Sequence, residues 1–172
     1  MYDAIRRFDD SVVVSNGNQT DTFGRYLRCG KSFEDAAITL LYEPDSPNYT
    51  PRISGFVEIG QKVAGISIVK KVGDEAIHKT WRYDTLDGNE LPLHDGIGRA
   101  IHTYQGEDSG ILSPYNEDPF VLPLMGNAED MANLLWNSLN PDTRVAVAVM
   151  AFSLTNQDVQ IHTINKHTQV NV

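Results

Sequence analysis

The chain has 172 residues, of which 41% are hydrophobic, and it carries a formal net charge of −9 from 23 acidic and 14 basic side chains. These values predict one globular domain, 1–172, with a real core, and they disfavour nucleic acid as a partner because an acidic surface repels phosphate at long range. A single cysteine excludes an internal disulfide, no apolar run is long enough to span a membrane, and no signal peptide is visible, so we expect a cytoplasmic protein without a membrane partner.

The chain opens with a predicted strand and a short helix. SVVVSNGN, residues 11–18, predicts a strand because a β-branched run precedes an Asn-Gly turn. TDTFGRYLRCG, residues 20–30, predicts a helix that Thr20 caps and Gly30 ends.

A longer helix is expected next. In KSFEDAAITLLY, residues 31–42, the side chains of Ser32 and Asp35 have the spacing of a capping box, and alanines and leucines form one apolar face. Glu43 would then follow the helix directly, where a carboxylate faces an unfavourable macrodipole.

Strands dominate the middle of the chain. Runs rich in β-branched and aromatic residues, separated by Gly, Gln and Asp, predict strands at residues 52–60, 62–71, 75–83 and 98–105. Loops are expected at residues 93–98 and 106–119.

The chain ends with a helix and a hairpin. NAEDMANLLWNSLN, residues 127–140, predicts a helix that Asn127 caps. The runs at 143–154 and 158–167 predict two paired strands. The order of all these elements predicts an α+β fold, or a layered sandwich with mostly antiparallel sheets.

Residues 15–21, SNGNQTD, gather polar side chains and a glycine between the first strand and the first helix. One reading is a turn with a helix cap. The other is a binding rim, in which helix-start N–H groups and polar side chains hold an anionic or amide-bearing ligand. An acidic chain holds an anion where its few basic groups are focused in one cleft. The candidate binding residues of this segment are Asn16, Asn18, Thr20 and Asp21.

Residues 43–55, EPDSPNYTPRISG, combine polar side chains with three prolines. Proline fixes φ, removes a donor and restricts the preceding residue, so we expect an extended loop that forms a pocket wall. The alternatives to a role in the site are that Glu43 is simply exposed to solvent and that Arg52 forms a structural ion pair. We expect Glu43, Arg52 and either Asn48 or Thr50 to share one concave site with part of residues 15–21, and all four are candidate site residues.

The five histidines show no metal-ligand spacing, and the sequence has no nucleophile signature. No metal and no cofactor is therefore predicted. His102, in IHTYQ, is the histidine proposed for the site, against the alternative that it is a surface or core residue.

Four segments occur in one order: YDAIRRFDDSVVVSNGNQTDT, FEDAAITLLYEPDSPNYTPRISG, IHTY and ANLLWNSLN. Through them the chain resembles the archaeal-type IMP cyclohydrolase family, and most of all its bacterial branch. The matches cover nearly the whole chain, and SNGNQTDT and PNYTPRISG are the most specific.

The resemblance implies an αββα sandwich like that of the N-terminal-nucleophile hydrolases, without a self-processed nucleophile. It also implies a reaction, the ring closure of 5-formamidoimidazole-4-carboxamide ribotide to inosine monophosphate (IMP) with loss of water. The carboxamide nitrogen attacks the formyl carbon of the same molecule, so no enzyme nucleophile is needed. The implied partner is thus a small-molecule nucleotide.

The resemblance also implies roles for single residues. Glu43 would relay the amide proton, and Tyr2 would donate a hydrogen bond to the formyl oxygen. Arg52 would pair with phosphate or polarise a carbonyl group, while the 16–20 loop would bind polar edges of the substrate.

One departure from the family concerns the N-terminus. Family members have a longer segment before the tyrosine, whereas this chain begins at Met1, one residue before Tyr2. We therefore expect the family's N-terminal strands to be absent and one sheet to be incomplete at its edge. A second chain, or another copy in a homo-oligomer, would fill the gap.

Three functions stay open at this point. The first is the purine-pathway cyclohydrolase. The second is a relative that binds a nucleotide without turnover, or acts on another nucleotide or amide. The third is a structural or interaction protein on the same scaffold, in which side chains would fill the pocket.

Overall fold

The structure is a computed structural model that describes residues 2–84, 96–105, 112–153 and 158–167. The chain divides into two compact units, of which the first comprises Met1–His94 and Arg99–Leu122 and the second comprises Asp95–Gly98 and Pro123–Val172. All the longer sheet pairings that the structure describes are antiparallel, and helices are few, so the protein has an α+β fold.

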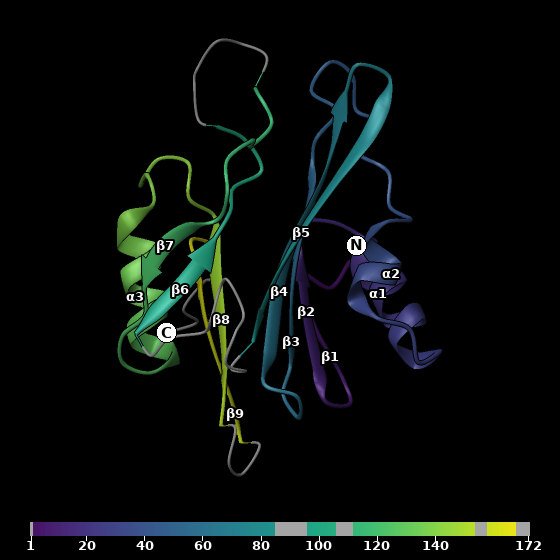
Figure 1. Ribbon diagram of the computed structural model, residues 1–172. Helices are drawn as coiled ribbons and strands as arrows, with labels where there is room; N and C mark the ends of the chain where they lie inside the picture. The colour runs from purple at the N-terminus through teal and green to yellow at the C-terminus, as the bar shows by residue number, and fades with distance from the viewer. Residues whose placement is uncertain (1, 85–95, 106–111, 154–157, 168–172) are drawn as a thin grey trace. The chain divides into compact units, whose positions relative to one another are not determined.

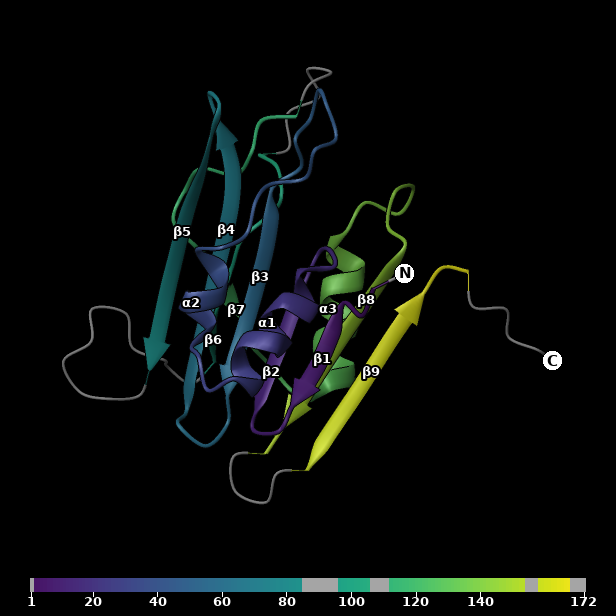
Figure 2. The same ribbon diagram turned by 90° about the vertical axis from the view of Figure 1, so that its right-hand side faces the viewer.

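The first unit is built on a five-stranded sheet in which strands adjacent in the sequence are also adjacent in space, in the order β1-β2-β3-β4-β5 (Figures 1 and 2). Its strands are β1 (Ile5–Phe8), β2 (Ser11–Ser15), β3 (Arg52–Glu58), β4 (Val63–Val72) and β5 (Glu75–Asp84). The expected strands at 11–18, 52–60, 62–71 and 75–83 are confirmed. Strand β1 was not predicted, because four residues are too few to show an alternating pattern.

Two helices inserted between β2 and β3 cover one face of this sheet (Figures 1 and 2). They are α1 (Gln19–Arg28) and α2 (Phe33–Ala37). The interface between helices and sheet is the core of the unit, and it contains buried apolar side chains from both layers.

Three stacked aromatic rings fill this core. The ring of Phe33 lies 4.3 Å from that of Phe23 and 4.2 Å from that of Phe56, measured between centroids, and all three side chains are buried. A Cβ atom at Gly65 would lie 2.1 Å from the Phe56 ring, so only glycine leaves room for it. Because side chains alternate along a strand, Arg52 and Ser54 point to the same helix-covered face as Phe56.

Helix α1 begins two residues earlier than predicted, and its cap is a different residue. Asn18 occupies the cap position without a side-chain hydrogen bond to the helix, and Thr20 lies inside the first turn. The end is as expected, because Gly30 follows Cys29 with a φ of 68°, a left-handed conformation that favours glycine.

Helix α2 has the predicted capping box but is shorter than predicted. Ser32 and Asp35 exchange both hydrogen bonds of the box, and the helix ends at Ala37. The hydroxyl of Thr39 donates to the Ala36 carbonyl at 2.7 Å and so competes for a helical acceptor. The expectation that Glu43 lies at a helix end is therefore wrong, and the macrodipole argument does not apply to it.

The loop after Glu43 is compact rather than extended, because Asp45 folds it back on itself. The backbone N–H of Glu43 donates to the Thr50 carbonyl at 3.1 Å. The Asp45 carboxylate accepts hydrogen bonds from the Thr50 N–H at 2.7 Å and from the Thr50 hydroxyl. The prolines restrict single residues, but these cross-loop bonds decide the shape.

The second unit contains the C-terminal helix and hairpin. Asn127 caps α3 (Ala128–Ser138), as predicted, and forms a capping box with Asp130. The predicted hairpin is formed by β8 (Ala146–Phe152) and β9 (Val159–Asn165), with Val149 opposite His162.

Two short strands, β6 (Ile97–Ala100) and β7 (Phe120–Pro123), pair with each other. Only the start of the strand expected at 98–105 is confirmed, since β6 ends before His102. Strand β7 falls next to the expected 106–119 loop and was not predicted. The parts of the predicted loops at 93–95 and 106–111 lie outside the described residues.

The aromatic stack predicts a large loss of stability in Phe33→Ala. Removing the middle ring leaves a cavity between two buried rings, so the free energy of unfolding should fall by about 3–5 kcal/mol. Denaturant titration followed by circular dichroism measures this change. The control is Ile38→Ala, at a side chain that is 65% exposed, which should change stability by less than about 0.5 kcal/mol. Equal losses in both variants would contradict the assigned core.

The closed loop predicts an acid-sensitive contact at Asp45. Hydrogen bonds from the Thr50 hydroxyl and then the Thr50 N–H hold the pKa of the Asp45 carboxyl below its usual range. The loop contact is then fully present above the unfolded pKa, near pH 4, and is lost as the pH falls through the folded pKa. Carboxyl ¹³C NMR should place the Asp45 midpoint below that of a free aspartate, and Thr50→Val should raise it. An unchanged midpoint in Thr50→Val would refute the contact.

Candidate functional site

The turn between β2 and α1 is fixed from inside by two hydroxyl groups. The hydroxyl of Ser15 donates to the Gly17 carbonyl at 2.8 Å, and it lies 2.5 Å from the hydroxyl of Thr20. Thr20 is 1% exposed. Its hydroxyl is therefore used within the turn, although the sequence placed it among the ligand-binding residues.

Asn16 ties this turn to β3 through its whole amide group. Its Nδ2 donates to the Pro51 carbonyl at 2.9 Å and to the Thr103 hydroxyl at 3.4 Å. Its Oδ1 accepts from the Ile53 N–H and from Gln19 Nε2, both at 3.0 Å. These four bonds use the donors and acceptors of the side chain, so Asn16 holds the turn against the strand.

Tyr2 contacts the same turn. Its hydroxyl donates to the Asn16 carbonyl at 3.0 Å, and the residue is 47% exposed. The predicted catalytic tyrosine is thus brought to the SNGNQTD segment.

Arg52 connects the turn to the loop that contains Glu43. Its Nη1 lies 2.8 Å from Glu43 Oε1, and it donates to Asn18 Oδ1 at 2.9 Å and to Gln19 Oε1 at 2.8 Å. Its Nε donates to the Leu41 carbonyl at 2.8 Å. The Arg52 side chain is only 14% exposed, whereas that of Glu43 is 35% exposed. The guanidinium is therefore held from four sides, and the carboxylate next to it is partly open to solvent.

Gln19 was not among the predicted site residues, although it lies inside the SNGNQTDT motif. It is 2% exposed, and its Nε2 donates to Asn16 and to the Ile53 carbonyl. Its Oε1 accepts from Arg52. Gln19 is thus the link between the amide of Asn16 and the guanidinium. The sequence signal for it was a polar residue just before the predicted helix, which is not specific.

Gly17 lets the turn approach this cluster. A Cβ atom at this position would lie 2.5 Å from Gln19 Oε1, 3.0 Å from Arg52 Nη1 and 3.3 Å from Glu43 Oε1. Any side chain would push at least one of the three away, so glycine is required by space rather than by backbone conformation.

The cluster opens into a cavity of about 600 Å³ on the helix-covered side of the sheet. The residues around it are Asn18, Gln19, Thr22, Arg25, Tyr26, Cys29, Lys31, Thr39, Leu40, Leu41 and Arg52. Three of them are cationic and none is a carboxylate. This volume lies in the range of about 300–1,000 Å³ that is usual for small-molecule sites.

A second, smaller hollow of about 380 Å³ lies near Val14, Asn16, Ile66 and Arg99. Val14 alternates with the core residue Val13, so this hollow borders the sheet face opposite to the helices. Its lining is mostly apolar, and the amide of Asn16 is already fully hydrogen-bonded, so the first cavity is the better candidate for a polar ligand.

Like Glu43, which is connected to the first cavity only through its contact with Arg52, the remaining predicted residues do not line either cavity. Asp21 forms an ion pair with Arg6 at 3.1 Å, and its side chain is 68% exposed. Asn48 is half-buried in the loop turn, where its N–H donates to the Asp45 carbonyl at 3.0 Å. The roles predicted for these two residues stay predictions.

Thr50 and His102 also lie away from the guanidinium. The Thr50 hydroxyl lies 2.6 Å from the Tyr104 hydroxyl, and only its carbonyl reaches back to Glu43. The His102 ring stacks on Tyr115 at 5.4 Å and meets Phe120 edge-on at 4.8 Å. The concave site expected to combine Glu43 and Arg52 with Asn48 or Thr50 is therefore reduced to Arg52 with its partner Glu43.

The chemistry available here is proton transfer and anion binding. A carboxylate fixed by a charge-assisted hydrogen bond presents an oriented acceptor. Within the described part of the chain, no three His, Cys, Asp or Glu side chains gather where they could hold a metal ion. Likewise, no helix among the described residues is long and apolar enough to cross a membrane.

Comparison with known proteins adds the family. The model of the family described as IMP cyclohydrolase-like protein matches residues 1–157. An IMP cyclohydrolase of Methanosphaera stadtmanae is 35% identical over 96 residues, an alignment that covers 49% of this chain and 47% of the archaeal protein. The chain thus spans about half the length of this curated relative. Because the family model covers most of the sequence, the chain belongs to the IMP cyclohydrolase-like protein family.

Proposed function

We propose that this chain closes the second ring of the purine, converting 5-formamidoimidazole-4-carboxamide ribotide to IMP with loss of water. The observation that carries the proposal is the Glu43–Arg52 pair, held by Asn18 and Gln19 beside a 600 Å³ cavity with cationic walls. Family membership and the name of the archaeal relative support the same reaction.

The reaction needs orientation and proton transfer. The carboxamide nitrogen forms a bond to the formyl carbon and loses one proton. The formamido nitrogen loses a second proton as its double bond to that carbon forms, and the formyl oxygen gains both protons and leaves as water. Glu43 takes the first proton and returns it toward the departing oxygen. Holding both arms of the substrate in contact lowers the barrier further, because an intramolecular attack depends strongly on geometry.

Arg52 has donors left for the substrate. In the described part of the chain its hydrogen bonds use Nε and Nη1. The two Nη2 N–H groups can therefore polarise the formyl or carboxamide oxygen while Nη1 holds Glu43. Asn18 lies beside it, while Asn16 and Thr20 act by holding the turn in place.

A nucleotide-binding relative without turnover is the second candidate function. The position of Tyr2 favours it, because the phenol hydroxyl is engaged by the Asn16 carbonyl rather than free for a formyl oxygen. An absorbance assay for IMP formation, run beside calorimetry with IMP, separates the two. Turnover supports the cyclohydrolase, binding without turnover supports the relative, and neither overturns both.

The proposal also includes the arrangement of the layers, the cellular location and the partners of the protein. Each unit supplies one helical layer on an antiparallel sheet, which supports an αββα sandwich of the N-terminal-nucleophile hydrolase type. We further propose that residues 1–172 form a single domain and that the protein is cytoplasmic. Its partners would be a nucleotide and a second copy of the chain.

Glu43→Gln should lower turnover by at least about 100-fold, because the amide keeps the shape but cannot accept a proton. The absorbance assay measures turnover, and thermal melting checks the fold. The matched control is Glu34→Gln, since Glu34 also pairs with an arginine, Arg82 at 3.1 Å, and has a similar side-chain exposure of 34%. Near-normal turnover in Glu43→Gln would remove Glu43 from the chemistry.

Arg52→Lys should weaken IMP binding by about 1.5–3 kcal/mol. An ammonium group cannot contact Glu43, Asn18 and Leu41 and still present a planar pair of donors to the ligand. Calorimetry with IMP measures the change, and Arg82→Lys, outside the cavity lining, is the control. Equal affinity in Arg52→Lys and the original chain would place the ligand elsewhere.

A further inference from the structure

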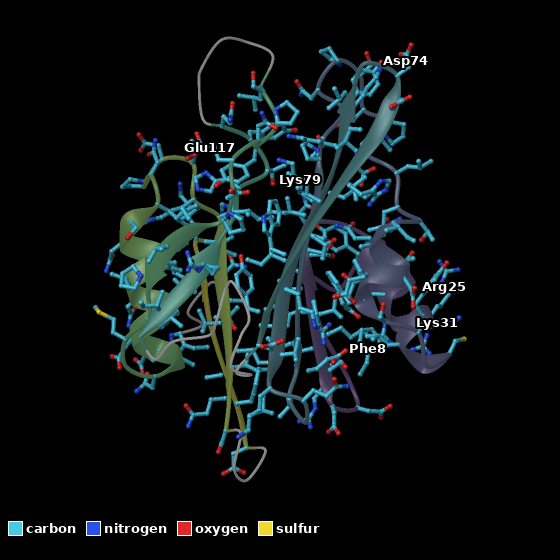
Figure 3. The ribbon with its side chains drawn as sticks, viewed as in Figure 1. Phe8, Arg25, Lys31, Asp74, Lys79 and Glu117 are labelled. Atoms are coloured by element: carbon cyan, nitrogen blue, oxygen red, sulfur yellow. The ribbon has the colours of Figure 1, made fainter. Side chains whose placement is uncertain are left out.

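The lining of the cavity contains two cations that the proposed chemistry does not use. They are Arg25, in the last turn of α1, and Lys31, just after it. Figure 3 shows both side chains at the outer end of the helical layer. The chain has a net charge of −9, so cations without a carboxylate among the described lining residues form a local exception.

The sequence explains why Arg25 faces the cavity. Thr22, Arg25, Tyr26 and Cys29 are spaced i, i+3, i+4 and i+7 along α1, so they share one stripe of the helix, and all four line the cavity. Arg25 donates to the Thr22 hydroxyl at 3.1 Å. No ion pair engages it within the described residues, so its charge is available to a ligand.

Lys31 is placed by the end of the helix rather than by a loose loop. The N–H of Gly30 donates to the Leu27 carbonyl at 2.9 Å, and the N–H of Lys31 donates to the Tyr26 carbonyl at 3.0 Å. These two bonds form a Schellman motif, which fixes the backbone of Lys31 to the same helix as Arg25. Lys31 also interacts with Asp35, whose carboxylate already accepts from the Ser32 N–H at 2.9 Å and does not line the cavity.

The dipole of α1 alone does not explain why Arg25 and Lys31 both line the cavity. A helix C-terminus favours any nearby cation, and Arg28 in the same turn satisfies that preference too. The guanidinium of Arg28, however, lies 5.7 Å from the centroid of the Phe8 ring, and Arg28 does not line the cavity. Arg25 and Lys31 therefore share a position that Arg28 lacks, and Arg28 provides a control of equal charge.

The spacing along α1 suits an elongated ligand. Asn18 contacts Arg52 at the start of the helix, and Arg25 is seven residues later, which corresponds to roughly 10 Å of helix rise. A ligand with its reacting ring beside Glu43 and an anionic group at the far end would span this distance. The hydroxyls of Thr22 and Tyr26 add hydrogen-bond donors at the same end.

From this arrangement we propose that Arg25 and Lys31 form a binding site for a phosphate monoester, the 5′-phosphate of the ribotide. The inference rests on the proposed function for the identity of the rest of the ligand. The assignment of the anion as a phosphate follows from the cavity lining alone. A guanidinium and an ammonium group on one rigid backbone frame bind phosphate by charge-assisted hydrogen bonds.

Calorimetry on the 172-residue chain tests the site with IMP, ribose 5-phosphate, inorganic phosphate and inosine. IMP should bind at least about tenfold more tightly than inosine, and Arg25→Ser and Lys31→Ser should each remove about tenfold of IMP affinity. Arg28→Ser, with the same loss of charge, should leave the affinity within about twofold. Ribose 5-phosphate binding better than inorganic phosphate identifies a sugar phosphate rather than the free ion as the ligand.

The contrary results are equally clear. Equal losses of IMP affinity in Arg25→Ser and Arg28→Ser would show only long-range electrostatic attraction and would overturn the site. Inosine binding as tightly as IMP would overturn it too. Arg25→Lys keeps the charge and should retain most of the affinity, which excludes misfolding as the cause of the loss. If the original chain forms IMP but the Arg25 and Lys31 variants bind IMP with unchanged affinity, the phosphate site is wrong and the cyclohydrolase proposal stands. If the original chain binds its ligands through their phosphate but forms no IMP, the cyclohydrolase proposal is wrong and the phosphate site stands.

Discussion

The guanidinium of Arg52 holds together three parts of the chain that are far apart in sequence. It joins the β2–α1 turn, the loop after α2 and the first residue of β3, through Gln19, Glu43 and the Leu41 carbonyl. A guanidinium on a side chain that is only 14% exposed is costly unless charged or polar partners compensate it. The one carboxylate and the neutral acceptors around it meet this need, so the geometry of the site follows from the need to satisfy one cation.

The turn that carries the SNGN sequence is shaped by this requirement. Gly17 has no side chain, so its backbone can lie against the cluster. Asn16 makes four side-chain hydrogen bonds, two of which connect the turn to Pro51 and Ile53 at the start of β3. Gln19 joins the two systems, since it donates to Asn16 and accepts from the guanidinium. Polar residues that first suggested direct ligand contacts therefore divide into those that hold the frame and those that face the cavity.

The charge of the cavity wall is opposite in sign to the net charge of the chain. The chain as a whole is acidic, yet the cavity wall contains Arg25, Lys31 and Arg52 and no carboxylate among its described residues. Glu43, at the edge of the cluster, compensates Arg52 rather than the other two. A field of one sign inside a cleft attracts an anion even when the surrounding surface repels it. The acidic composition that disfavoured nucleic acid is thus compatible with a small phosphorylated ligand.

The sequence by itself determined the local elements that short-range rules control. The strands β2 to β5, the capping box at Ser32, the cap at Asn127 and the C-terminal hairpin follow from alternation, cap spacing and turn residues within a few positions. The motifs also identified the family and pointed to Glu43 and Arg52. Only the tertiary structure decided that α2 stops at Ala37, that Asp45 closes the loop, and that Gln19 rather than Thr50 completes the cluster. The first two outcomes depend on side-chain hydrogen bonds, from Thr39 to Ala36 and from Thr50 to Asp45, that compete with the backbone preferences of the segment. The third depends on bonds such as that from Gln19 to Ile53, 34 positions apart, and no local pattern encodes such a pairing.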